Sequence, residues 1–302
     1  LDLNKTVMID EILGQGGIIM KQKKAAVVMQ TDFGKGIAVC TMQGVCMMVD
    51  KKLKIFDCSH DINNFDTYQA SISLDYIVDF WPTGTVFISV VDPGVGTSRR
   101  ASVAKLKNGS YVVTPDNGTL THLKERIGIE EVRVIDEKIN RLKNTEKCNI
   151  FHGRDLFAYC GARLASGIIT FEEVGPAYDV NEIVTHELIP YKVEKSVITG
   201  MIANADYHFG LICSNIPAEV FEKENIQYGD YVHVTIRKKG QDAPAFEGEV
   251  PFCRSFGFVE EGKPLLMVSE SLHIQAALNC ENMAEKYDLH AGSDWTMKIE
   301  KR

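Results

Sequence analysis

The chain has 302 residues, of which 45% are hydrophobic and 25% are charged, with 24 glycines and 9 prolines. These values lie near the average for globular proteins and exclude a disordered, collagen-like or coiled-coil chain. At roughly 100–200 residues per domain, the length predicts two domains, each with its own core. The formal net charge of −8 argues against a nucleic-acid partner, because phosphate binding requires a concentrated basic face.

Cysteine usage and hydropathy indicate a cytoplasmic protein. Eight cysteines are scattered along the chain without any C-x-x-C pair, which favours buried, reduced thiols over disulfides. No apolar run approaches the ~18 residues needed to cross a bilayer, so we expect no membrane association. Residues 1–24 are expected to form a flexible extension. Its lysines at 21–24 imitate the start of a signal peptide, but the apolar run after them is too short for one, and Met20 is a candidate natural start.

Residues 25–175 alternate short apolar runs with patterns of helical spacing. Strands are expected at 25–30, 53–58, 84–91 and 111–113, and helices at 37–49 and 67–80. Because the apolar runs are nearly continuous, these strands are predicted to be covered on both faces of a sheet. The alternation of strand and helix predicts an N-terminal α/β domain.

The pattern changes after residue 175. Residues 176–194 are polar and contain proline, and we interpret them as a linker. Within the second domain, residues 195–302, short strands are expected at 196–203, 210–213, 231–237, 245–251 and 264–268. Strands of this length, separated by Gly, Pro and Lys turns, predict a small β-sandwich or β-barrel.

Polar residues recur where the predicted N-terminal strands end, at Asp32, His60, Asp92 and Asp116. In an open α/β sheet, ligands bind outside the carboxyl ends of the strands, which favours a site at this edge. The alternative is that aspartate closes these strands simply because it suits turns. A metal site at His60, Asp61 and Cys58 lacks a coherent ligand spacing, so no metal is expected.

Two segments concentrate chemically active side chains. Residues 90–100 read VVDPGVGTSRR, in which a strand ends at Asp92, a glycine turn admits a ligand to the backbone and two arginines follow. The run is neither a Walker loop nor a Rossmann fingerprint. Residues 151–155, FHGRD, place a titratable group and a fixed cation at the start of a predicted helix. The alternative for this second segment is a capping aspartate with surface charges.

Together with TDFG at 31–34, SHD at 59–61, PDNG at 115–118 and ADYHFG at 205–210, these segments resemble one family in order and spacing. It is the S-adenosylmethionine (SAM) hydroxide adenosyltransferase family, whose relatives include the fluorinating and chlorinating 5′-halogenases. The resemblance implies an N-terminal α/β domain, a C-terminal β-barrel domain and a homotrimer. Each active site would lie between one subunit's N-terminal domain and a neighbour's C-terminal domain. The implied reaction is the hydrolysis of SAM to adenosine and methionine, without a further cofactor.

The resemblance assigns the chemistry to Asp92, Arg99 and His152. Asp92 would position a water near the ribose, Arg99 would favour its hydroxide character, and His152 would form a hydrogen bond to it or accept its proton. The residue that takes the proton is left open. The sulfonium is a good leaving group on a primary carbon, so in-line attack by water is expected. The halogenases carry Tyr at the position of Asp92, and the fluorinating ones a halide-binding Ser at that of Gly153, which favours hydrolysis here.

The resemblance also implies substrate contacts. Asp32 matches a carboxylate that binds the ribose hydroxyls, and Asp206 matches one that receives the methionine ammonium. The aromatic residues that match contacts to the sugar or the adenine are Phe65, Phe209 and Phe252.

Several recognition positions depart from the family pattern. Leu211 stands where an Asn usually reads the adenine edge, and a leucine has no group that can do so. Glu270 and Gln275 also fall at substrate-binding positions; Glu270, Leu272 and Gln275 replace the usual Ser, Gly and Glu, respectively. These changes leave two alternatives open: a non-catalytic protein that binds adenosine or SAM on the same fold, and a SAM-dependent halogenase.

Overall fold

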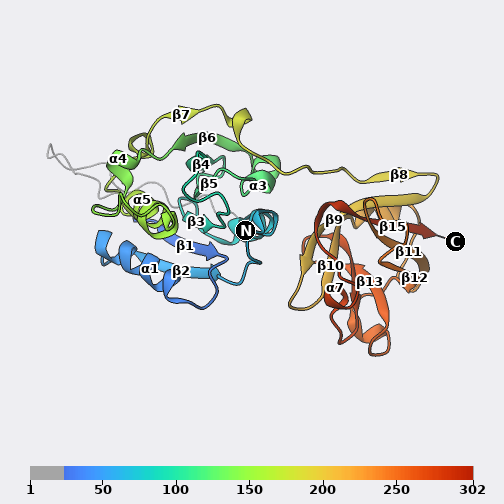
Figure 1. Cartoon of the computed structure of the whole chain (residues 1–302). Coiled ribbons are helices and arrows are strands. Elements are labelled where there is room, and N and C mark those ends of the chain that lie inside the picture. Colours follow the sequence, from blue (N-terminus) through green and yellow to red (C-terminus); the bar gives the residue numbers. More distant parts are fainter. Residues whose placement is uncertain (1–23, 302) are drawn as a thin grey trace, which may run out of the picture.

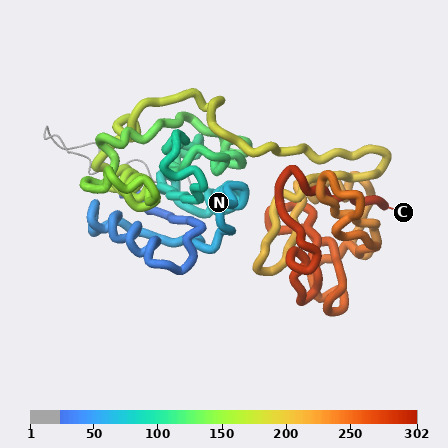
Figure 2. The backbone as a smooth tube through the Cα atoms, in the orientation of Figure 1, coloured from blue at the N-terminus to red at the C-terminus, as the bar shows by residue number. Residues whose placement is uncertain are grey.

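The computed structural model describes residues 24–301. Except for Lys24, the extension expected at the N-terminus therefore lies outside the described residues. Figure 1 shows an N-terminal part, coloured blue to green, and a C-terminal part, coloured orange to red, joined by an extended segment. The backbone tube in Figure 2 follows the same path between the two parts. Each part is built on one sheet with its own buried core, which agrees with the expected pair of folds.

The N-terminal part has a seven-stranded sheet in the order β2-β1-β3-β5-β4-β6-β7. The strands are β1 (Ala26–Thr31), β2 (Lys54–Ser59), β3 (Val86–Val90), β4 (Ala101–Leu106), β5 (Tyr111–Pro115), β6 (Ile129–Val134) and β7 (Ala177–Tyr178). Neighbours among β2, β1, β3 and β5 are parallel, whereas β4, β6 and β7 add antiparallel pairs. The carboxyl ends of the four parallel strands therefore meet at one edge.

Helices cover both faces of this sheet, so the prediction of a doubly covered α/β domain is confirmed. One face carries α1 (Ile37–Val49) and α5 (Tyr159–Ala165), and the other carries α2 (Thr67–Ile77) and α3 (Thr121–Arg126). Successive side chains of β1 point to opposite faces. Val27 and Met29 thus join the core beneath α1 and α5, whereas Val28 packs with Leu74 of α2. Short helical turns complete the domain: α4 (Glu137–Asn140), η1 (Val78–Phe80), η2 (Gly153–Ala158), η3 (Glu172–Val174) and η4 (Val180–Glu182).

The C-terminal part is an antiparallel sheet in the order β12-β11-β15-β9-β10-β14-β13, with β8 beside β9. Its strands are β8 (Lys192–Glu194), β9 (Val197–Asp206), β10 (Leu211–Pro217), β11 (Tyr231–Lys238), β12 (Phe246–Pro251), β13 (Pro264–Val268), β14 (His273–Leu278) and β15 (Gly292–Lys301). The helical turns α6 (Glu219–Lys223), η5 (Phe256–Phe258) and α7 (Met283–Lys286) connect them.

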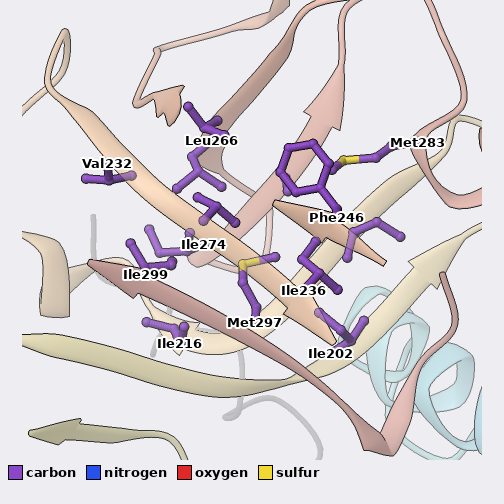
Figure 3. Close-up of a cluster of buried hydrophobic side chains, with 14 of the residues drawn as sticks. Ile202, Ile216, Val232, Ile236, Phe246, Leu266, Ile274, Met283, Met297 and Ile299 are labelled. Carbon is purple, nitrogen blue, oxygen red and sulfur yellow. The ribbon is translucent and has the colours of Figure 1, made fainter. Parts of the chain in front are cut away.

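The two end strands of this sheet come together and almost close it. Phe252 and Leu266 form a parallel bridge, and the Cys253 N–H donates to the Leu266 carbonyl at 2.8 Å. Side chains from several strands, among them Ile236 of β11 and Met297 of β15, fill the interior (Figure 3). The expected C-terminal β-barrel is therefore confirmed.

All eight cysteines are free thiols, in agreement with the expectation of reduced cysteines, but the expectation that they are buried is wrong for Cys40, Cys58 and Cys280, which are exposed. Burial raises the pKa of both Cys46 and Cys160 to about 12, so these two remain protonated. Among the helices of residues 24–301, none has the length and apolar character required to cross a membrane.

The residues expected to form a linker contact both parts of the chain. β7 extends the N-terminal sheet and Ile183 is buried in its core, whereas β8 pairs with β9 of the barrel. Between β7 and β8, His186 lies against Gly118. A Cβ added to Gly118 would come 2.4 Å from the Nε2 atom of His186. The same Nε2 lies 3.0 Å from the Thr67 hydroxyl. These contacts fix the linker to α2 and to the turn before α3.

A second histidine, His122, is partly buried in the same cluster. Its Nδ1 lies 2.8 Å from the Ser71 hydroxyl, and the Tyr68 ring packs edge-on against both His122 and His186. The Tyr68 hydroxyl donates to the Ala203 carbonyl of β9 at 3.2 Å. This aromatic cluster therefore joins the two parts directly.

We expect the protein to lose stability in mild acid because of this cluster. Burial, followed by the nearby His186, lowers the pKa of His122 from 6.5 to about 4. The folded state binds this proton less tightly than the unfolded state. The contribution of the neutral His122 side chain to the free energy of unfolding is therefore complete above about pH 6.5. It is lost as the pH falls toward 4, at a cost on the order of 3 kcal/mol.

Urea unfolding at pH 7 and pH 4.5 measures this loss in the native protein and in His122→Gln. The variant has no imidazole to protonate, so it should lose clearly less stability between the two pH values. Equal losses in the two proteins would assign the acid sensitivity to other groups.

Candidate active site

The ends of the parallel strands carry the predicted polar residues, and hydrogen bonds tie these ends together. Thr31 Oγ1 lies 2.9 Å from His60 Nδ1, and the Gly34 N–H donates to the His60 carbonyl at 2.7 Å. His60 therefore joins the turns that follow β1 and β2. Asp116 lies farther along the edge and accepts bonds from Arg100 and from the Val184 N–H, so it anchors the linker.

Asp92, Arg99 and His152 form a connected, nearly buried cluster. Arg99 Nε donates to Asp92 Oδ1 at 2.9 Å and to Oδ2 at 3.1 Å, and its Nη2 donates to Oδ2 at 2.5 Å. The same Nη2 lies 3.0 Å from His152 Nδ1. The side chains of Asp92 and Arg99 are only 5% and 10% exposed. Ion pairs and hydrogen bonds are strengthened in such a water-poor environment.

The loop between Asp92 and Arg99 is held by short-range contacts. The Val95 N–H donates to the Asp92 carbonyl at 3.2 Å, and the Thr97 N–H donates to that of Gly94 at 3.1 Å. Gly96 adopts a φ of +77°, and a Cβ there would lie 2.6 Å from the Asn149 carbonyl oxygen. Only glycine fits this approach, which brings the loop against the segment that carries His152.

The segment around His152 is a π-helix, η2, that continues into α5. Such single π turns are frequent at functional sites. Arg141 stabilises the segment that precedes η2, because its Nη2 donates to the carbonyls of Thr145 and Cys148 at 3.1 and 2.5 Å. Phe157, one turn beyond His152, places its ring 5.2 Å from the Arg99 guanidinium carbon. The sequence predicted a helix here but not its π geometry.

Burial lowers the pKa of His152, and the adjacent Arg99 cation lowers it further. The imidazole is therefore neutral near neutral pH. Its Nε2 atom is buried and has no hydrogen-bond partner among the described residues.

A cleft of about 240 Å³ opens beside this cluster. Its lining comes from the turns after β1, β2 and β3 and from the start of η2: Asp32, Phe33, Asn64, Phe65, Val90, Asp92, Val95, Ile150, Phe151, His152 and Gly153. A Cβ on Gly153 would lie 3.2 Å from the Phe33 ring and 3.4 Å from Val90, so a larger residue would narrow the cleft.

Asp32 and Phe65 are coupled at the mouth of the cleft. Phe65 has a φ of 69°, which is rare for a bulky residue, and its side chain is 67% exposed. Its N–H donates to Asp32 Oδ2 at 2.9 Å. Asp32 thus holds the turn that presents the Phe65 ring. The sequence did not single out Ile150, which is 82% exposed at the same mouth; its only signal is an apolar residue directly before FHGRD.

The predicted substrate-binding residues of the C-terminal part do not line this cleft within one chain. Asp206 Oδ1 accepts the N–H groups of His208 and Phe209, which leaves the Phe209 ring 66% exposed. Phe252 is buried in the barrel, where it stacks on Tyr228 with ring centroids 4.5 Å apart.

The remaining two predicted positions lie near one end of β14. Gln275 is buried on that strand, opposite Cys213 of β10 and Met267 of β13. Glu270 is exposed in the turn before it. The structure thus brings together Asp32, Phe65, Asp92, Arg99 and His152, and it places the C-terminal set elsewhere in the same chain.

Comparison with known proteins agrees with this architecture. The SAM hydroxide adenosyltransferase N-terminal domain matches residues 27–175, and the C-terminal domain of that family matches residues 200–296. A curated (R)-S-adenosyl-L-methionine hydrolase of Methanocaldococcus jannaschii is 31% identical over 229 residues, which cover 74% of this chain and 78% of that protein. A fluorinase of an Actinoplanes species is 27% identical over 283 residues, which cover 84% and 91%.

A solved structure has the same fold. An uncharacterized conserved protein from Thermotoga maritima superposes with a TM-score of 0.78 at 31% identity, and the match covers 91% of this chain and 100% of that one. The two domain matches span both sheets, and the cleft lies within the first. The chain therefore belongs to the SAM hydroxide adenosyltransferase family.

Proposed function

We propose that this protein hydrolyses SAM to adenosine and methionine by attack of water at C5′. The observation that carries the proposal is the buried Asp92–Arg99–His152 cluster beside the cleft. The hydrolase names of relatives from Methanocaldococcus and Thermus support it. Because the leaving group is already a sulfonium cation, expulsion of the thioether needs no added activation, and we propose that no cofactor takes part.

The cluster suits an attacking oxygen that gains negative charge. The Asp92 carboxylate can accept a hydrogen bond from water and orient it, and the fixed Arg99 cation stabilises charge that develops on the oxygen. Both side chains are nearly removed from solvent, so their effect on the barrier is larger than it would be in water.

A halogenase is the second candidate, because fluorinases are also among the relatives. An anionic carboxylate at Asp92 would repel a halide that must approach the same carbon. Gly153 offers no hydroxyl donor, and its contacts with Phe33 and Val90 leave little room for one. Hydrolysis is therefore the activity that these residues favour.

A binding protein without turnover is the third candidate, and the C-terminal surface is the feature that favours it. Leu211 and Gln275 stand where the family resemblance implies contacts to adenine, and a leucine side chain cannot form a hydrogen bond with the base. Recognition of adenine would then rely on backbone groups or on stacking.

We propose that the active protein is a homotrimer, in which a neighbour's C-terminal residues complete each cleft. The supporting observation is that the cleft is lined by the N-terminal part alone, while Asp206 and the exposed Phe209 lie elsewhere on the chain. Light scattering should give about three times the chain mass of 33.7 kDa; a monomer that is fully active would contradict this arrangement.

We expect purified protein incubated with SAM to release adenosine and methionine in equal amounts. Chromatography of parallel reactions, with the two sulfonium epimers supplied separately and with or without excess chloride or fluoride, tests all three candidates. Equal products that are unaffected by halide support hydrolysis. A 5′-halogenated nucleoside would establish the halogenase, and bound, unchanged ligand recovered after denaturation would establish the binding protein.

A further inference from the structure

The hydrogen bond between Arg99 and His152 fixes which nitrogen of the imidazole carries the proton. A guanidinium only donates, so the Nδ1 atom that lies 3.0 Å from Arg99 Nη2 must offer its lone pair. A neutral imidazole has one N–H, which is then on Nε2. Nε2 is buried and unpartnered among the described residues, which suits a donor that waits for an acceptor. Neither nitrogen has a free lone pair.

Burial and two of the four charges that face His152 oppose its protonation. Arg99 and Arg141 lower its pKa, Glu137 and Asp92 raise it, and burial exceeds each of these. A second proton on Nδ1 would point at the Arg99 cation and would break the bond between them. The ring can therefore accept a proton at Nδ1 only if Arg99 Nη2 moves away from it.

Asp92, in contrast, retains capacity to accept. Its Oδ2 receives two N–H contacts from Arg99 and its Oδ1 receives one, whereas a carboxylate has about four acceptor positions. Asp92 also lines the cleft, where a substrate-bound water would lie.

We propose that His152 is a positioning residue, held as the Nε2–H tautomer, that fixes Arg99 through Nδ1, and that Asp92 takes the proton of the attacking water. This assignment rests on the proposed hydrolysis. The water oxygen forms a bond to C5′, and the C5′–S bond breaks with its electron pair on sulfur, which gives the neutral thioether of methionine. The water proton passes to the Asp92 carboxylate and then to solvent.

The tautomer can be measured without any substrate, so this arm is independent of the proposed function. Protein labelled with nitrogen-15 in its histidines should show, for His152, an unprotonated Nδ1 and a protonated Nε2 that do not titrate between about pH 5.5 and pH 8. The His152 signals are identified by their loss in His152→Asn. A protonated Nδ1, or a titration within this range, overturns the proposal.

Kinetics of three variants test the positioning role. In His152→Asn, the amide oxygen Oδ1 lies near the position of the imidazole Nδ1 and can still accept a hydrogen bond from Arg99. In His152→Gln, the amide group lies near the position of Nε2 instead, and His152→Ala replaces neither nitrogen. We expect kcat to fall by about 10-fold in His152→Asn and by roughly 10³-fold in His152→Gln and His152→Ala. His233→Asn serves as the control, because His233 lies on β11 of the barrel, outside the cleft lining. Equal losses in all three variants, together with the disappearance of a kcat/KM limb near the imidazole pKa, would make His152 the base.

Discussion

Asp92→Asn should reduce kcat for SAM hydrolysis by about 10³-fold or more, the largest loss expected from any isosteric change in this protein. The amide keeps the shape of the side chain, but it lacks the charge and the second acceptor oxygen that orient water and receive its proton. It also leaves the nearly buried Arg99 cation without its counter-ion. The change in KM should be smaller, because Asp92 acts on the water rather than on the substrate. Initial rates over a range of SAM concentrations separate the two constants.

The control for this variant is Asp75→Asn. Asp75 also pairs with an arginine, since Arg126 Nε donates to its Oδ1 at 2.7 Å, but it lies on α2, away from the cleft lining. This variant measures how the loss of an aspartate–arginine ion pair outside the cleft affects the rate, and it should keep native kcat. If Asp92→Asn turned over SAM within 10-fold of the native rate, the chemistry would have to lie elsewhere.

Elements with strong periodicity were predicted well from the sequence. The helix expected at 37–49 is α1, and the strand expected at 264–268 is β13, with the same bounds. Both are long or continuous apolar patterns bounded by glycine, proline or charged turns. The sequence analysis identified no strand for β4 and β6. β6 reads IEEVRV, in which charged residues alternate with buried ones, so it lacks the continuous apolar run of a central strand.

β14, which reads HIQAAL, and β15 were not identified from the sequence either. β15 begins at Gly292 but alternates polar with apolar residues only from Asp294 to Glu300, and its extent follows from its pairing with β9 and β11. Strand pairing of this kind depends on contacts between residues far apart in the chain, which local patterns do not contain.

The candidate site was likewise only partly predictable, because some of its contacts join residues far apart in the sequence. Asp32 and Asp92 could be placed at one edge because they follow buried parallel strands, and the structure brings both to the cleft. The pairing of Arg99 with both Asp92 and His152 depends on the approach of Gly96 to Asn149, which joins two loops about fifty residues apart. The roles proposed for Asp206, Phe209, Phe252, Glu270 and Gln275 remain predictions, because these residues lie outside the cleft of their own chain.

Arg154→Met should destabilise the N-terminal domain by about 3 kcal/mol. Asp155 has a fully buried side chain, and Arg154 is the only described side chain that donates to its carboxylate, with Nε to Oδ1 at 2.6 Å and Nη2 to Oδ2 at 3.0 Å. Methionine keeps the apolar stem but leaves a buried charge without a partner, which costs more than the ion pair itself contributes. Thermal and urea unfolding measure the loss, which should lower Tm by several degrees.

The double variant Arg154→Met with Asp155→Asn identifies the cause, because it removes the charge together with its partner. It should regain more than half of the lost stability, a coupling that independent sites would not show. Lys223→Met is the matched control: Lys223 and Glu219 form an exposed pair, so this change should cost less than about 0.5 kcal/mol. Since His152 directly precedes the π-helix that contains Arg154, Arg154→Met should also lose activity at a lower temperature than the native protein. If the double variant were no more stable than Arg154→Met, the loss would come from packing of the arginine on Phe151 rather than from the stranded carboxylate.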